Sequence, residues 1–223
     1  MATILITGAN RGIGLALAQQ YAARGDTVIG VCRHGSPALE QTGARVEAGV
    51  DVTDDAAVET LARRLADTRI DVLVLNAGIL GNESLGAIDA AGFDSMRRQF
   101  EVNALGPLRV AQALRDRLAD NAKVGILTSR MGSVADNGSG GYYGYRASKA
   151  AVNAIGKSLA LDLAPRGIAV VLLHPGYVAT DMVGGHGDVS PAQAAIQLVA
   201  RLDALTPERS GSFQHANGTE LPW

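Results

Sequence analysis

The feature that most constrains the fold is a regular alternation of short apolar runs with longer segments of helical period. Six runs are rich in β-branched residues and mostly continuous in apolar character, at Thr3–Ile6, Thr27–Cys32, Arg45–Val50, Asp71–Leu75, Lys123–Thr128 and Ile168–His174. Continuous runs indicate strands buried on both faces. The helical segments are Ile13–Arg24, Asp54–Asp67, Phe93–Leu118, Tyr145–Ala164 and Pro191–Leu205. The alternation predicts a doubly wound α/β fold, with a central parallel sheet flanked by helices on both faces.

The chain shows no internal repeat, low-complexity tract or linker. Its 223 residues are therefore expected to form one domain, 1–223, that carries every site. Asp54 is predicted to cap the second helix and Ser190 the last, where Pro191 takes the first helical position. The least regular segments are Gly132–Gly144, Val183–Val189 and the tail from Pro207.

Charge and cysteine content exclude several classes of function. Twenty Lys and Arg face twenty-two Asp and Glu, a net charge of −2, so no basic excess is available for nucleic acid or an anionic membrane. Cys32 is the only cysteine and forms no internal disulfide, which fits a reducing compartment. The first strand run begins at Thr3 and leaves no room for a signal peptide, so we expect a cytoplasmic protein. The chain has four histidines, including His186, and none has a second metal ligand at a suitable spacing. We therefore expect no metal site.

A glycine-rich turn follows the first strand, with the sequence Thr7-Gly-Ala-Asn10-Arg11-Gly-Ile13-Gly14. In a doubly wound Rossmann fold, a pyrophosphate binds at this turn on the free N–H groups of the following helix. Gly8 would permit the tight turn, Gly12 would let the phosphates approach, and Gly14 would let the helix pack on the sheet. The turn predicts a dinucleotide site, although a glycine cluster also forms ordinary turns.

The end of the second strand indicates which dinucleotide is bound. A carboxylate there would bind the ribose 2′-hydroxyl of NAD, but the strand ends in Cys32-Arg33-His34. Arg33, joined by Arg11, is placed to meet a 2′-phosphate, so NADP(H) is favoured over NAD(H). Two solvated arginines are the alternative. Asp51 and Val52 follow the third strand, where a carboxylate accepts from the adenine amino group or serves only as a turn residue.

Tyr145 and Lys149 are four residues apart on a predicted helix and therefore share one face. A tyrosine has a pKa near ~10, and a nearby cation favours the phenolate and lowers that value. Such a phenol can protonate the alkoxide that develops as hydride reaches a carbonyl carbon. The pair predicts carbonyl or alcohol chemistry when it follows a dinucleotide-binding turn.

Taken together and in this order, these motifs resemble the short-chain dehydrogenase/reductase family. The residues that carry the resemblance run from residue 3 to about 181 and comprise Thr7–Gly14, Asn76-Ala77-Gly78, Asn103, Ser129, Tyr145 with Lys149, and Pro175-Gly176. The tail Gly211–Trp223 is similar to the C-termini of the small Sniffer-like carbonyl reductases and C-factor proteins.

The resemblance implies a role for each matched residue. Tyr145 would be the general acid in reduction and the base in oxidation, and Lys149 would lower its pKa and bind the nicotinamide ribose. Asn103 would hold a water that links the lysine to solvent. Asn76, Ala77 and Gly78 would line the adenosine side. The nicotinamide would be contacted by Pro175, Gly176, Val178 and Thr180.

The catalytic serine is harder to place. The family's hydroxyl lies about thirteen residues before the tyrosine, and this position is Gly132. Ser129 ends the fifth strand run and is favoured, which makes the following loop longer by three residues, a pattern associated with the Sniffer-like members. Ser133 is the rival, and Thr128 and Ser139 are weaker alternatives. The hydroxyl would stabilise the developing oxyanion.

The function predicted first is an NADPH-dependent reductase that transfers hydride to an aldehyde or ketone, and that can also run as an alcohol dehydrogenase. The alternative is a signalling protein that keeps the fold without turnover, as the C-factor resemblance suggests. The short glycine-rich stretch Met182–Ser190 predicts an open substrate pocket. Candidate lining residues are Met131, Tyr142, Tyr143, Tyr177, Met182 and His186. A homodimer or homotetramer is expected through the helices Phe93–Leu118 and Tyr145–Ala164.

Overall fold

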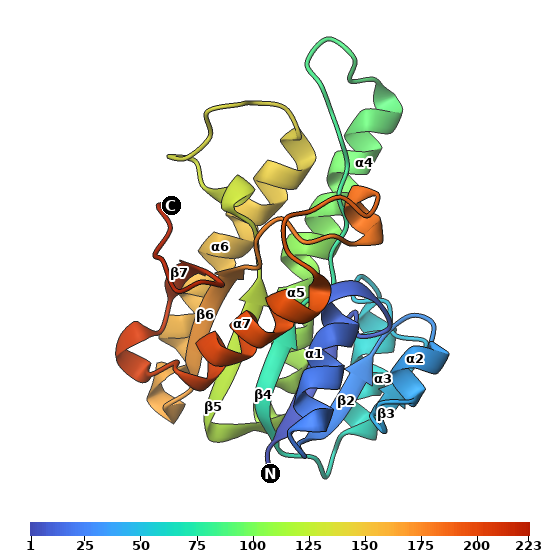
Figure 1. Cartoon of the computed structure of the whole chain (residues 1–223), viewed down its shortest axis with the longest axis vertical. Coiled ribbons are helices and arrows are strands. Elements are labelled where there is room, and N and C mark those ends of the chain that lie inside the picture. Colours follow the sequence, from blue (N-terminus) through green and yellow to red (C-terminus); the bar gives the residue numbers. More distant parts are fainter.

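A seven-stranded parallel sheet forms the centre of the molecule (Figure 1). The computed structural model describes residues 1–223, and the strand order is β3-β2-β1-β4-β5-β6-β7. Every neighbouring pair is parallel. The strands are β1 (Thr3–Thr7), β2 (Thr27–Val31), β3 (Arg45–Glu47), β4 (Ile70–Leu75), β5 (Leu118–Leu127), β6 (Ala169–His174) and β7 (Ser212–His215). The predicted doubly wound fold is confirmed.

Helices cover both faces of the sheet and divide the core into two clusters. On one face, α1 (Gly12–Ala23) and α7 (Pro191–Asp203) pack on β1 and β6. On the other, α3 (Asp55–Arg64), α5 (Gly106–Leu114) and α6 (Tyr143–Leu163) bury the second cluster. The short helix α2 (Pro37–Glu40) lies beyond β2, and α4 (Ala90–Phe100) packs beside α6. No helix combines the length and apolar character that a membrane crossing needs.

The predicted helix caps are present. Asp54 accepts hydrogen bonds from the backbone N–H groups of Ala56 and Ala57. Ser190 forms a complete capping box with Gln193, and Pro191 occupies the first helical position, where its missing N–H has no intrahelical partner to lose. These local sequence signals therefore set two of the helix starts.

The predicted helix Phe93–Leu118 is wrong in its middle and at its end. The chain runs from α4 into a π-helical turn, Glu101–Leu105, before α5 begins. Pro107 has no N–H to donate to the carbonyl four residues back, and the Gly106 N–H bonds instead to Glu101, five residues back. A 3-10 turn, Arg115–Arg117, ends this region, and Leu118 belongs to β5.

Two elements were not predicted. The tail forms β7, which pairs with β6 from Val171 to His174. Four residues give too short a run for a periodicity signal, and strand pairing with β6 supplies the backbone partners. The helix α2 is also four residues long and is capped by Ser36. The third strand is shorter than Arg45–Val50, because pairing with β2 stops at Glu47.

Candidate active site

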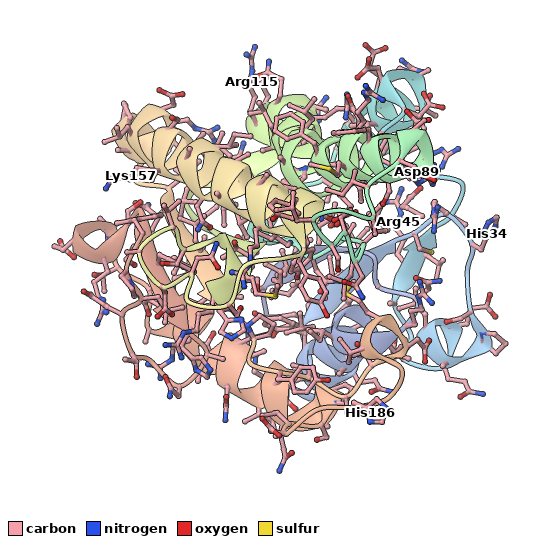
Figure 2. All side chains as sticks on the ribbon, turned by 90° about the horizontal axis from the view of Figure 1, so that it is seen from above. His34, Arg45, Asp89, Arg115, Lys157 and His186 are labelled. Carbon is pink, nitrogen blue, oxygen red and sulfur yellow. The ribbon has the colours of Figure 1, made fainter.

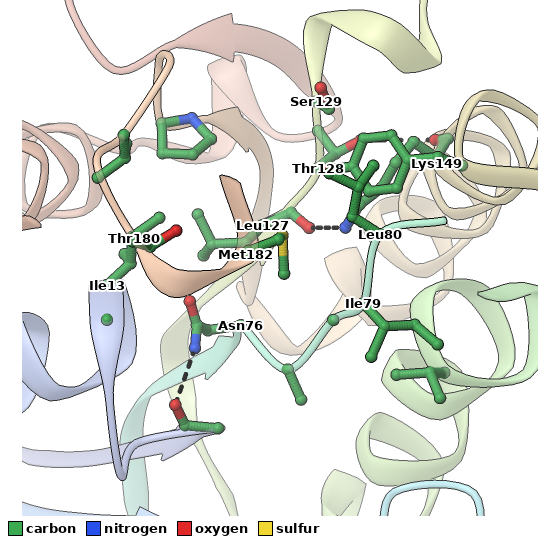
Figure 3. Close-up of a pocket in the computed structure, with 18 of the residues that line it drawn as sticks. Ile13, Asn76, Ile79, Leu80, Leu127, Thr128, Ser129, Lys149, Thr180 and Met182 are labelled. Atoms are coloured by element: carbon green, nitrogen blue, oxygen red, sulfur yellow. Dashed lines mark hydrogen bonds between the residues drawn. The ribbon is translucent and has the colours of Figure 1, made fainter. Parts of the chain in front are cut away.

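A cavity of about 1150 Å³ opens at the carboxyl edge of the sheet, the edge toward which the strand arrows point in Figure 1. This is the edge at which doubly wound proteins bind ligands. Nearly all predicted site residues line it: Gly8, Asn10, Arg11, Gly12, Ile13, Arg33, Asp51, Val52, Asn76, Ala77, Gly78, Ser129, Tyr145, Lys149, Pro175, Gly176, Val178 and Thr180. Gly14 and Asn103 are buried and do not line the cavity. Figure 3 shows part of this cavity, with Ile13 and Asn76 on one side and Ser129 and Lys149 on the other.

The glycine turn is built with no room for side chains at two of its positions. Gly8 adopts a φ of +68°, a left-handed conformation that favours glycine. A Cβ on Gly14 would lie 2.2 Å from the carbonyl oxygen of Gly8, so α1 packs directly on the turn. Gly12, with a φ of +54°, opens toward Thr180 across the cavity. The backbone thus leaves the free N–H groups at the start of α1 accessible.

Hydrogen bonds join the ends of β1 and β4 below the turn. The Thr7 hydroxyl accepts from the backbone N–H groups of Asn76 and Ala77, at 3.0 and 3.1 Å. The Asn76 side-chain amide donates to the carbonyl of Thr7 at 2.9 Å and to that of Gly8 at 3.2 Å. Figure 3 shows one hydrogen bond of this amide. The predicted Asn-Ala-Gly segment therefore supports the glycine turn as well as lining the cavity.

Arginines and one carboxylate surround the adenosine end of the cavity. Arg33 lies 3.9 Å from an oxygen of Asp51. Asp51 is also a turn residue, because its other oxygen accepts from the N–H and the hydroxyl of Thr53. Burial alone would raise the pKa of Asp51, but these hydrogen bonds and the charges of Arg33 and Arg98 hold it below its usual range. Arg98 on α4 lines the cavity and was not predicted, since an exposed helical arginine carries no sequence signal.

Ser129, Tyr145 and Lys149 come together on the opposite wall. The Ser129 hydroxyl is close enough to the Tyr145 phenol to favour a lower pKa for it. The Lys149 ammonium is buried, donates to the carbonyl of Leu127 at 2.8 Å, and lies 5.8 Å from the centre of the Tyr145 ring. The end of β5 supplies the serine, and the first turns of α6 supply the other two.

The expected effect of Lys149 on Tyr145 is not what the structure shows. Burial raises the pKa of Tyr145 to about 12, and the Ser129 hydroxyl only partly opposes this shift. Burial also lowers the pKa of Lys149 to about 8. The structure therefore differs from the prediction of a lowered tyrosine pKa, because burial dominates the shift and the ammonium is directed to the Leu127 carbonyl.

Asn103 is placed by the π-helical turn. Its side-chain oxygen accepts from the Ile79 N–H at 2.8 Å, and its amide donates to the Ile79 carbonyl at 2.9 Å and to Ser148 at 3.0 Å. The Ser148 hydroxyl in turn donates to the carbonyl of Tyr145. Asn103 thus joins the loop after β4 to the helix that carries Tyr145. Its predicted water-holding role stays a prediction.

A comparison with known proteins agrees with this geometry. The family model described as short chain dehydrogenase matches residues 2–189. The chain belongs to the short-chain dehydrogenase/reductase family.

Two curated relatives align with most or all of the chain. It is 46% identical over 229 residues, covering 100% of both sequences, to 1-hydroxy-2-glutathionyl-2-methyl-3-butene dehydrogenase of Rhodococcus sp.. It is 48% identical over 158 residues to the C-signal of Myxococcus xanthus, covering 69% of this chain and 93% of that one.

Among solved structures, the carbonyl reductase Sniffer of D. melanogaster superposes with a TM-score of 0.89 at 29% identity. A carbonyl reductase from Pseudomonas aeruginosa in complex with NADP gives 0.84 at 34% identity. Both cover 100% of this chain and of the matched chain. The resemblance to Sniffer-like and C-signal members is confirmed.

The four hydroxyl candidates of this short-chain dehydrogenase occupy different surroundings. Ser129 lines the cavity and contacts Tyr145. Ser133 is buried away from the cavity, where it donates to the carbonyl of Trp223. The Thr128 hydroxyl donates to Asn153 at 2.7 Å, and Ser139 accepts from Arg146. Of the four, only Ser129 lies next to the Tyr145 phenol.

Gly132 occupies the position where the family spacing places the hydroxyl, and it has no space for a side chain. A Cβ there would lie 2.7 Å from the backbone carbonyl carbon of Lys149. Close packing of the 3-10 turn Arg130–Gly132 on α6 therefore excludes a serine at this spacing.

The substrate end of the cavity is lined by residues from several loops. Of the predicted lining residues, Met131, Tyr142, Tyr177 and Met182 are present, whereas Tyr143 and His186 are not. His186 lies at the outer edge of the molecule (Figure 2). Residues that were not predicted are Leu80, Gly81, Asn82, Arg130, Asp136, Arg146 and His174.

His174 borders the substrate end as a neutral imidazole. Burial, with the charges of His215 and Arg130, lowers the pKa of His174 to about 4. Its Nδ1 atom is buried without a hydrogen-bond partner. No group of three His, Cys, Asp or Glu side chains is arranged to hold a metal ion.

The cavity of this short-chain dehydrogenase fits a dinucleotide phosphate. The left-handed glycines leave backbone N–H groups free at a helix N-terminus, which is the arrangement that binds pyrophosphate. Arg11, whose nearest acidic partner Asp181 is 3.5 Å away, and Arg33 offer guanidinium groups at the same end. Ile13, Asn76 to Gly78 and Thr180 line the path from these groups to Tyr145.

Proposed function

We propose that this protein is an NADP-dependent oxidoreductase that moves a hydride between NADP(H) and the carbonyl or alcohol carbon of a small molecule. One observation carries the proposal: Ser129, Tyr145 and Lys149 share one wall of the cavity that begins at the glycine turn. The enzyme class is the chemistry of its family. The NADP preference and the roles of the residues are inferred from the site.

Each residue has a distinct task in carbonyl reduction. NADPH, when bound, supplies the hydride that adds to the carbonyl carbon. Ser129 donates a hydrogen bond to the substrate oxygen, and Tyr145 transfers its phenolic proton to that oxygen, which yields the alcohol. Lys149, whose ammonium lies 5.8 Å from the centre of the Tyr145 ring, would bind the nicotinamide ribose of the cofactor beside it. Asn103 and solvent would resupply the proton. In oxidation, the Tyr145 phenolate accepts the proton instead.

Two features support NADP(H) over NAD(H). The end of β2 presents Arg33 and no carboxylate to the cavity, and Arg11 faces the same end. A structure at 34% identity is a complex with NADP. Guanidinium groups bind phosphate through charge-assisted hydrogen bonds, and this is the interaction we assign to Arg33.

The substrate class follows from the open end of the cavity and from one relative. The stretch Met182–Ser190 is short, and Gly184, Gly185 and Gly187 reduce its bulk. The Rhodococcus relative is a dehydrogenase of a glutathionyl-substituted alcohol by its name. We therefore propose bulky alcohols and their carbonyl products as substrates, with thioether-substituted alcohols among them.

We also propose that the protein works in the cytoplasm as a homodimer or homotetramer. Phe93 and Phe100 on α4, Leu108 on α5 and Leu161 on α6 are exposed apolar side chains on the helices expected to assemble. An apolar helical face of this kind fits a second copy of the chain. Light scattering of the purified protein measures the mass of the assembly.

A signalling role without turnover is the second candidate, because the C-signal of Myxococcus xanthus is 48% identical over 158 residues. The discriminating feature is the catalytic set, since Asn103, Ser129, Tyr145 and Lys149 are all present in this chain. A protein without catalytic activity does not need these four residues, so their presence together favours the enzyme.

The experiment compares NADPH and NADH binding and oxidation with wild type and Tyr145→Phe. The substrates are simple aldehydes, quinones, α-diketones, cyclic ketones and, in the reverse direction, a glutathionyl alcohol. Turnover with NADPH that is lost in Tyr145→Phe, while NADPH binding remains, supports the proposal. Binding without turnover over the whole panel favours the signalling role. Absence of binding to both cofactors would overturn the dinucleotide site.

A further inference from the structure

Glu83 is a buried carboxylate in the loop between β4 and α4, and all of its donors are neutral. Its Oε1 atom accepts from the Gln99 side-chain amide at 2.6 Å and from the Ser95 hydroxyl at 3.0 Å. Its Oε2 atom accepts from the Gly144 backbone N–H at 3.1 Å. Burying a carboxylate is costly even with such donors, so a charged group at this place requires an explanation.

The helix that carries Tyr145 has no cap of its own. The N-cap residue of α6 is Tyr142, which adopts a left-handed φ of +51° and forms no side-chain capping bond. Glu83 supplies the missing acceptor from 61 residues away in the sequence. Its own carbonyl also accepts from the Tyr142 N–H at 2.9 Å. A negative charge at a helix N-terminus is stabilising, so both the charge and the geometry suit a cap.

Two glycines make space for the network around Glu83. A Cβ on Gly144 would lie 2.6 Å from the Gln99 amide nitrogen and 2.9 Å from the Cα atom of Met96. A Cβ on Gly81 would lie 2.3 Å from the same nitrogen. The Gln99 side-chain oxygen then accepts from the Gly81 N–H at 2.8 Å. The loop, α4 and α6 are thus joined at one point, where α4 and α6 lie side by side (Figure 2).

The network connects the two sides of the substrate end. Gly81 and Asn82 line the cavity on one side, and Tyr142 and Tyr145 line it on the other. Glu83 directly follows Asn82, and Gly144 directly precedes Tyr145. We infer that Glu83 is a positioning residue that fixes the first turn of α6, and with it the Tyr145 phenol, relative to the loop that borders the substrate. This inference rests on the proposed function.

The test uses Glu83→Gln and a swap variant, Glu83→Gln with Gln99→Glu. In Glu83→Gln, the new side-chain NH2 group must face either the Gly144 N–H or the Gln99 NH2 group. Both of these are donors, so one hydrogen bond is replaced by two donors that face each other. The swap restores the pattern, because the amide introduced at position 83 would accept from Gly144 and donate to the carboxylate introduced at position 99. Asp89→Asn is the matched control. It weakens the cap of α4, where Asp89 accepts from Gly92, and it lies outside the cavity (Figure 2).

Three measurements separate positioning from general stability. We expect kcat to fall on the order of tenfold in Glu83→Gln, since small displacements of a catalytic group have large effects on rate. The NADPH Kd should stay within about twofold, because the glycine turn is untouched. Amide hydrogen exchange of the first turn of α6 should accelerate. The swap should recover most of the kcat and the protection, and Asp89→Asn should change neither.

Equal kcat in Glu83→Gln and wild type would overturn the inference. A kcat that falls without faster exchange in α6, or that the swap does not recover, would also overturn it. Hydrogen exchange reports on Glu83 even if wild type shows no turnover. In that case the proposed function fails, while the exchange result still decides whether Glu83 holds the start of α6.

Discussion

The two ends of the cavity are built in different ways. The cofactor end is formed by backbone, where the glycine turn packs on itself and Thr7 and Asn76 join two neighbouring strands. The substrate end is formed by side chains from distant loops, such as the Glu83 network and the Arg130–Asp136 ion pair. The cofactor end has no room for a methyl group at Gly14. By contrast, a Cβ added at Gly138, in the loop at the substrate end, would meet no other atom within 4 Å.

The difference indicates how the fold separates constant from variable tasks. The backbone-built turn, to which we assign the phosphates of the cofactor, tolerates little change because a methyl group at Gly14 has no room. Loops held by side-chain bonds can be altered one bond at a time, because a hydrogen bond to a charged group contributes only about 1.5–3 kcal/mol. Function on a shared fold therefore varies at the substrate end.

The largest expected effect is at the glycine turn. Gly14→Ala places a methyl group 2.2 Å from the Gly8 carbonyl oxygen, so α1 must move away from the turn. We expect a loss of unfolding free energy of about 2 kcal/mol or more and a loss of NADPH binding, measured by urea unfolding and by cofactor fluorescence. Gly138→Ala in the substrate-side loop is the control and should bind NADPH as wild type does. Normal binding in Gly14→Ala would contradict the tight-turn account.

Cofactor choice gives the next effect. Arg33→Asp replaces the guanidinium with a carboxylate that repels a 2′-phosphate and can accept from a ribose hydroxyl. The NADPH Kd should rise by about tenfold to a hundredfold, while the NADH Kd stays equal or falls. Arg97→Asp, an exposed change on α4, is the charge-matched control. A parallel loss of both cofactors would show that Arg33 does not discriminate between them.

A smaller effect concerns stability and pH at the junction of the two ends. Burial lowers the pKa of Lys149 from 10.5 to about 8, so between these values the unfolded chain binds a proton that the folded chain does not. The unfolding free energy contributed by Lys149 therefore rises with pH across this window, by about 1 kcal/mol between pH 7.5 and 9. Comparing urea unfolding of wild type and Lys149→Met at both pH values isolates the term. Identical pH slopes in the two proteins would disprove it.

The smallest effect is expected in the substrate-side loop. Asp136 pairs with Arg130, and both line the cavity. Asp136→Asn removes the charge partner of Arg130, whose side chain is exposed, and ion pairs with an exposed member contribute little to stability. The melting temperature should be unchanged, whereas the substrate KM should shift by about twofold to threefold because Arg130 becomes free to move. The cofactor KM serves as the internal control, and a larger shift there than in the substrate KM would contradict the division between the two ends.

Sequence patterns predicted the parts of the molecule that depend on local chemistry. Buried strand runs, the Asp54 and Ser190 caps and the glycine turn each depend on neighbouring residues, so the sheet and the cofactor end followed from them. The strand β7 was missed because four residues become a strand only beside β6. Arg98, Arg130 and His174 were missed for the same reason: only the folded chain brings them to the cavity.

The tyrosine pKa shows a second limit of sequence reasoning. Spacing correctly placed Tyr145 and Lys149 on one helix face. The sign of the Tyr145 pKa shift, however, depends on burial and on the Leu127 carbonyl, which accepts the hydrogen bond of the Lys149 ammonium. Likewise, spacing alone pointed to Gly132 for the hydroxyl, whereas the contact between Gly132 and Lys149 excludes a side chain there. Distances between segments decide both questions.

The π-helical turn at Glu101–Leu105 has a consequence for how this region can change over generations. Deleting one residue from it would rotate every side chain before the deletion by about 100° relative to those after it, and Pro107 would still lack an N–H for the helix. Asn103 could then no longer meet both Ile79 and Ser148. The extra residue of the π-helical turn is therefore what allows one asparagine side chain to bind the loop after β4 and the helix that carries Tyr145 at the same time.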